Sequence, residues 1–150
     1  VRAVVALGWG QQEAKTKDAN IFYVKSVPHD WLFPHMAGAV HHGGAGTTAT
    51  SLRHALPTLV VPFGGDQPFW AERVYAAGCG PKAIPRDKLT AENLAEGLRA
   101  LISNPEYTRN AACIGEALRN EHGCANAADL IEKAVWDWEN GNPAQDGMNI

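Results

Sequence analysis

The sequence lacks the features that mark a membrane-spanning or nucleic-acid-binding protein. No apolar run among its 150 residues approaches the roughly 20 that cross a bilayer. Lys and Arg number 13 against 16 Asp and Glu, a formal net charge of −3. Without a basic excess, neither duplex nucleic acid nor an anionic membrane surface is an expected partner. The apolar start, residues 1–9, has no basic flank or cleavage site of a signal peptide and is predicted to be a strand.

Cysteine is scarce, and its spacing does not suit a disulfide framework or a zinc site. The three cysteines are Cys79, Cys113 and Cys124, an odd number without C-x-x-C spacing. The six histidines also lack ligand spacing, and the adjacent His41 and His42 would point to opposite faces of a strand. We therefore expect no metal and no cofactor. We also expect a reducing, cytoplasmic location, with the full-length protein peripheral to membranes.

The composition that remains is that of one soluble globular domain. Hydrophobic residues make up 45% of the chain and charged residues 19%. We expect a domain over residues 1–140 and a flexible tail over 141–150, which begins at Gly141-Asn142-Pro143.

Apolar, β-branched segments alternate with helical patterns along the chain. Strands are predicted at residues 2–7, 21–24, 39–42 and 58–61, with a further short candidate at 80–84. Helices are predicted at residues 31–36 (capped by Asp30), 47–55, 69–77, 90–102 (capped by Thr90), 105–121 and 126–138. This alternation is typical of the α/β class, with a doubly wound parallel sheet covered on both faces.

The strongest functional pattern is a glycine cluster between a strand and a helix. His41-His42 is followed by Gly43-Gly44-Ala45-Gly46 and then by Thr47-Thr48. Glycines let the backbone approach a ligand closely, and the free N–H groups and dipole of a helix N-terminus favour a diphosphate. Hydroxyls of Thr47 and Thr48 and the ring of His42 would add hydrogen-bond donors.

A second pattern, Asp66-Gln67, follows the next predicted strand. A carboxylate beside an amide can hold vicinal hydroxyls, as a sugar presents. An alternative is open here, because residues 44–49 also match the G-x-G-x-x-[GA] dinucleotide fingerprint and Asp66 lies 66 − 46 = 20 residues beyond Gly46. Against it, two strand candidates precede the fingerprint, and Asp66 lies in a Gly-Gly-Asp-Gln-Pro turn rather than at a strand end.

These two segments resemble the UDP-dependent glycosyltransferases of the GT-B fold, and more narrowly fungal and bacterial sterol 3-β-glucosyltransferases. The resemblance rests on residues 27–48 (VPHDWLFPHMAGAVHHGGAGTT) and 56–74 (LPTLVVPFGGDQPFWAERV). It implies the carboxyl-terminal, donor-binding half of such an enzyme, starting late in that domain. The acceptor site and the catalytic base would lie in an amino-terminal domain absent from this chain.

The resemblance also implies roles for single residues. His42 would contact the donor diphosphate and stabilise the leaving group; Gly44, Ala45, Gly46 and Thr47 would cradle the phosphates; Asp66 and Gln67 would hold the hexose. Val27 and His29 would contact the uracil, and Gly8 and Trp9 would line the nucleotide. Thr50 replaces the ribose-binding glutamate of many plant relatives and Ser26 replaces their tryptophan, which favours the sterol-type branch.

The function implied is inverting transfer of glucose from UDP-glucose to a sterol or other lipophilic hydroxyl. Alternatives are a non-catalytic UDP-sugar-binding or assembly module, an NAD-dependent dehydrogenase domain and a nucleotide-sugar epimerase. Since an incomplete sheet would expose an edge or an apolar face, we also expect a homo-oligomer.

Overall fold

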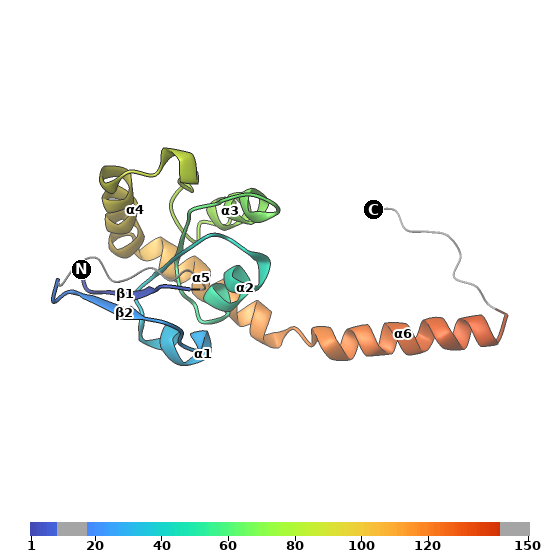
Figure 1. Cartoon of the computed structure of the whole chain (residues 1–150). Coiled ribbons are helices and arrows are strands. Elements are labelled where there is room, and N and C mark those ends of the chain that lie inside the picture. Colours follow the sequence, from blue (N-terminus) through green and yellow to red (C-terminus); the bar gives the residue numbers. More distant parts are fainter. Residues whose placement is uncertain (9–17, 142–150) are drawn as a thin grey trace.

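The computed structural model describes residues 1–8 and 18–141 (Figure 1). Its strands are β1 (Ala3–Ala6), β2 (Ile21–Val24), β3 (Ala39–His41) and β4 (Thr58–Val60). The short helical segments are α1 (His29–Leu32) and the 3-10 turns η1 (Phe33–His35) and η2 (Arg86–Lys88). The longer helices are α2 (Ala45–Arg53), α3 (Gln67–Ala76), α4 (Ala91–Ser103), α5 (Pro105–Asn120) and α6 (Gly123–Glu139). Of the predicted tail, residues 142–150 lie outside the described part of the chain.

The strands pair in parallel, as predicted for the α/β class. β1 pairs with β2, Ala3 opposite Ile21, and β3 pairs with β4, Ala39 opposite Thr58. Among the described residues these are two separate two-stranded pairs.

The candidate strand at residues 80–84 is not formed. The chain there still follows β4, because Thr58 N–H donates to Cys79 O (2.9 Å) and Ile84 N–H donates to Val60 O (3.0 Å). Between these bonds stands Pro81, which has no N–H to offer a ladder. The prediction of a strand was therefore wrong, although these residues do run parallel to β4.

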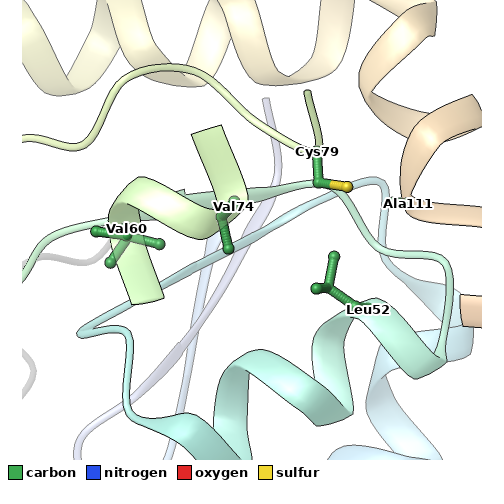
Figure 2. Packing of buried hydrophobic residues seen from close by; sticks show 6 residues of the cluster. Leu52, Val60, Val74, Cys79 and Ala111 are labelled. Atoms are coloured by element: carbon green, nitrogen blue, oxygen red, sulfur yellow. The ribbon is translucent and has the colours of Figure 1, made fainter. Parts of the chain in front are cut away.

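The main core lies where α2, β4, α3 and α5 meet. Figure 2 is a close view of this core, with Leu52, Val60, Val74, Cys79 and Ala111 labelled. Burial raises the pKa of the Cys79 thiol to about 11, the nearby Cys113 adding to the effect. Cys79 thus serves as a small apolar residue. The helix that follows the glycines is anchored in this core through Leu52.

Helix caps follow the predicted signals in the carboxyl-terminal half. Thr90 and Asn93 form a reciprocal capping box at the start of α4. Asn104 caps α5, whose first residue is Pro105.

The earlier caps differ from prediction. Asp30 does not cap α1; the cap residue is Pro28, whose extended backbone (ψ 127°) leaves Asp30 inside the first turn. α3 begins at Gln67, two residues before the predicted start, so that Asp66 becomes its cap residue.

α6 extends away from the rest of the molecule (Figure 1). It starts at Gly123, three residues before the predicted start, and contains no buried residue. Its large apolar side chains are exposed: Leu130, Ile131, Val135, Trp136 and Trp138. In residues 1–8 and 18–141, no helix is both long and apolar enough to cross a membrane.

Candidate functional site

The glycine turn leads from the end of β3 into α2. Gly43 has φ +89°, and a Cβ there would lie 2.5 Å from Val60 Cγ1, so this position requires glycine. Gly44 is the cap residue of α2, and the helix begins at Ala45 rather than at the predicted residue 47. Gly46 is therefore inside the first helical turn, where the peptide groups already point along the helix axis.

The N-terminus of α2 is open to solvent. Its cap residue makes no side-chain hydrogen bond to the helix. Within the described part of the chain, no protein acceptor is recorded for the N–H groups of Gly44, Ala45, Gly46 and Thr47, and the first bond into the helix is Thr48 N–H to Gly44 O (2.9 Å). Ala45 and Gly46 are exposed, and a Cβ built on Gly46 would meet no atom within 4 Å. Four free donors at the positive end of a helix form a suitable site for an anion.

The two histidines before the turn differ in exposure, although their rings lie edge to face with centroids 6.3 Å apart. His42 is exposed and lies against the turn, because a Cβ on Gly44 would come 2.5 Å from His42 Nε2. His41 faces inward. Its Nδ1 accepts a hydrogen bond from Gly43 N–H at 3.0 Å, and its Nε2 lies 3.2 Å from Ser51 Oγ. Burial, followed by the charges of His42 and His29, lowers the pKa of His41 to about 4.

The two threonines after the glycines also differ. Thr47 is half-buried, whereas Thr48 is 3% exposed and its hydroxyl has no hydrogen-bond partner. The prediction that Thr48 adds a donor for a ligand was wrong, because successive helical residues are rotated by about 100° and Thr48 faces the core.

Asp66 and Gln67 lie at the start of α3, in the turn that leads from β4 into this helix. Asp66 is exposed, and its Oδ2 accepts a hydrogen bond from Trp70 Nε1 at 2.8 Å. Gln67 Oε1 accepts from the N–H groups of Phe63 (2.7 Å) and Gly64 (3.2 Å). The amide oxygen of Gln67 is thus used to close its own turn, and its side-chain NH₂ group is what it can offer a ligand.

The two turns contact each other. A Cβ on Gly43 would lie 3.3 Å from Gln67 O and 3.7 Å from Gln67 Cβ. The structure therefore brings together the two segments that the sequence singled out. A hollow of about 390 Å³, lined by Pro62, Phe63, Arg86 and Asp87, adjoins the Gln67 turn at Phe63.

The remaining predicted residues lie outside this contact. Val27 is half-buried and His29 is exposed at the start of α1, where its ring stacks on Phe33 (centroids 4.7 Å apart). Gly8 is exposed just after β1 with φ +62°, and Trp9 is outside the described residues. Within the described ranges no hydrogen bond joins Val27, His29 or Gly8 to the glycine turn, so their roles stay predictions.

The sequence reasoning did not assign His41 and Ser51. Their contact joins the end of β3 to the middle of α2, residues ten apart in the chain. The one available signal was strand alternation, which directs one of two adjacent histidines inward. Within residues 1–8 and 18–141, no three His, Cys, Asp or Glu residues gather as metal ligands would.

Comparison with known proteins adds a family. Residues 3–132 match the family described as erythromycin biosynthesis protein CIII-like, C-terminal domain. The chain is 44% identical to a sterol 3-beta-glucosyltransferase of Arabidopsis thaliana, covering 88% of this chain and 22% of that protein. It is 39% identical to a sterol 3-beta-glucosyltransferase of Pichia angusta, covering 87% of this chain and 11% of that protein. The chain thus spans about a fifth or less of the length of these relatives, which include plant as well as fungal proteins.

Solved structures agree with the family match. The glycotransferase of kitacinnamycin superposes with a TM-score of 0.77 at 27% identity, over 88% of this chain and 34% of that one. The glycosyltransferase VinC, solved in complex with DTDP, superposes with a TM-score of 0.65 at 33% identity, over 69% of this chain and 26% of that one.

Proposed function

Since the chain belongs to the erythromycin biosynthesis protein CIII-like C-terminal domain family of GT-B glycosyltransferases, we propose that its glycine turn binds the diphosphate of a UDP-sugar. Membership of this family supports the assignment of the chain as a nucleotide-sugar-binding domain. The observation that supports the diphosphate position is the set of four free N–H groups from Gly44 to Thr47, at an uncapped and solvent-open helix end. The complex of VinC with DTDP supports a nucleoside diphosphate as the ligand class.

The reaction we propose is inverting transfer of glucose to a sterol or another lipophilic hydroxyl, after the names of the curated relatives. As the bond between the sugar and the diphosphate breaks, negative charge builds up on the leaving UDP. The N–H groups and dipole of α2 and a hydrogen bond from His42 would stabilise that charge without a metal ion. A base outside this chain would take the proton of the acceptor hydroxyl.

The hexose and the uracil of the donor have separate proposed contacts. Asp66 would accept hydrogen bonds from hexose hydroxyls through the carboxylate oxygen that Trp70 leaves free, and the Gln67 NH₂ group would donate to them. Val27 and His29 would contact the uracil, and Gly8 and Trp9 would line the nucleotide.

Gly46 offers the sharpest test, because the protein itself does not need glycine there. A Cβ at Gly46 meets no atom within 4 Å, so Gly46→Ala should fold and gain about 0.5 kcal/mol from helix propensity. If the diphosphate lies against this peptide, the methyl group will weaken UDP-glucose binding by at least about tenfold in calorimetry. Gly123→Ala is the matched control, since its Cβ also meets nothing but lies in α6.

The outcomes separate the alternatives. Equal UDP-glucose affinity for Gly46→Ala and the unsubstituted chain would refute the proposed position of the diphosphate. Tighter binding of NAD than of UDP would favour a dehydrogenase, in which the carboxylate oxygen of Asp66 that Trp70 leaves free would bind a ribose. UDP-glucose binding without transfer to a sterol, in the chain and in its assembled full-length form, would identify a non-catalytic binding module.

A further inference from the structure

His41 joins both sides of the glycine turn through one ring. Its Nδ1 accepts from Gly43 N–H (3.0 Å), which precedes the free N–H groups. Its Nε2 lies 3.2 Å from Ser51 Oγ, and Ser51 Oγ donates to Thr47 O (2.9 Å), at the far end of the same turn. The four peptides with free N–H groups lie between these two attachments.

The protons in this chain of contacts have one consistent assignment. Because Gly43 N–H is a donor, Nδ1 must be unprotonated, and the neutral ring then has its proton on Nε2. Nε2–H donates to Ser51 Oγ, since the single hydroxyl proton of Ser51 is already directed to Thr47 O. Ser51 is fully buried, so water does not compete for these bonds.

Packing against Val60 and Gln67 holds Gly43, and the hydrogen bonds of His41 restrain the turn further. Gly43 is in the left-handed region, where the backbone of glycine is permissive, and its N–H group does not take part in a strand or a helix. A turn that must be ordered when ligand binds loses affinity by the cost of that ordering. A turn held by His41 already presents its donors in one arrangement.

We propose that His41 is a positioning residue for the nucleotide-diphosphate site, holding Gly43 and, through Ser51, the peptide of Thr47, so that the N–H groups between them face the ligand. This inference rests on the proposed function. It assigns His41 no contact with the ligand, which distinguishes it from His42 on the exposed face.

The test is UDP affinity in a series of variants. His41→Phe keeps a ring and loses both hydrogen bonds, and should weaken UDP binding about tenfold or more, at roughly a factor of five for each bond. Ser51→Ala should cause part of the same loss of UDP affinity. His41→Asn restores an acceptor at the position of Nδ1 and should recover most of the affinity, which a merely space-filling role would not produce. Thermal unfolding checks that each variant is folded.

The tautomer is tested separately by nitrogen NMR of the His41 ring. We expect an unprotonated Nδ1 and a protonated Nε2 at neutral pH, with and without UDP, and a coupling across the hydrogen bond from Gly43. A protonated Nδ1, or a folded His41→Phe or Ser51→Ala chain that binds UDP as tightly as the unsubstituted chain, would overturn the inference. Failure of the unsubstituted chain to bind UDP would instead refute the proposed function and, with it, the role of His41 in ligand binding, whatever the tautomer.

Discussion

Two adjacent histidines, His41 at the end of β3 and His42 just after it, differ in what their rings contact. His42 is exposed beside the open helix end, and His41 is enclosed between the turn and α2. Thr47 and Thr48 differ in exposure in the same way. Thr47 is half-buried at the turn, whereas the hydroxyl of Thr48 is buried without a partner. At the residue scale, the direction of each side chain decides whether a polar group can serve a ligand.

The buried ring of His41 makes stability depend on pH. Its pKa is about 4 in the folded chain against 6.5 for an ordinary histidine, so the unfolded chain takes up this proton first as the pH falls. The contribution of His41 to the free energy of unfolding is complete above pH 6.5 and is lost as the pH falls toward 4. It amounts to up to about 3 kcal/mol. Urea unfolding at pH 7.5 and pH 4.5 should show a smaller decrease for His41→Asn than for the unsubstituted chain. Equal decreases would contradict the neutral, enclosed state of His41.

At the scale of elements, α2 depends on its neighbours as much as on its own sequence. Leu52 anchors it in the main core, and α5 crosses it closely because Gly115 has no side chain. A Cβ on Gly115 would collide with the backbone carbonyl of Leu52. The position of the helix end that presents the free N–H groups is therefore set partly by a helix much later in the sequence.

Gly115→Ala tests this dependence. Because the clash is with backbone, which cannot move aside cheaply, the substitution should lower the free energy of unfolding by about 2 kcal/mol or more. UDP binding should weaken as well, since α2 must shift. Ala117→Ser, on the exposed face of α5, is the control for helix propensity. Unchanged stability and UDP affinity in Gly115→Ala would show that α5 does not position α2. Denaturant unfolding and calorimetry measure both effects.

The elements themselves were largely predictable, and the exceptions have physical causes. Apolar runs predicted all four strands found in the described residues, and Thr90 and Pro105 predicted two helix starts. Pro81 kept a fifth strand from forming. The start of α2 was placed two residues late because Ala45 and Gly46 were assigned to the turn, although a helix tolerates glycine in its first turn.

The site was predictable where a motif marks it and not where packing makes it. The glycine turn and Asp66-Gln67 were found by local pattern, and the structure brings them into contact. The bonds of Asp66 to Trp70 and of His41 to Ser51 depend on helix rotation and burial, which spacing alone does not give.

At the scale of the whole molecule, the chain has a packed part around β4 and a projecting α6 (Figure 1). Since α6 buries none of its residues, its hydrogen bonds have little tertiary support. Its exposed apolar side chains are compatible with the predicted homo-oligomer, in which a second copy would cover them.

Hydrogen exchange distinguishes these states of α6. In dilute solution its amides should exchange at least about a hundredfold faster than those of α2 and α5, because opening them exposes no core. Protection in α6 that matches α5 at every concentration would contradict the lack of support. Protection that rises with concentration, together with a dimer mass in light scattering, would confirm the homo-oligomer.

The central claim is that the peptide N–H groups at the start of α2 bind a diphosphate. An amide NMR titration of the chain with UDP, and with uridine as the ligand that lacks phosphate, tests it most directly. We predict that UDP produces the largest shifts at the signals of Gly44, Ala45, Gly46 and Thr47, and that uridine leaves these four unchanged. Binding of UDP that leaves these signals in place, with its largest shifts elsewhere, would contradict the account.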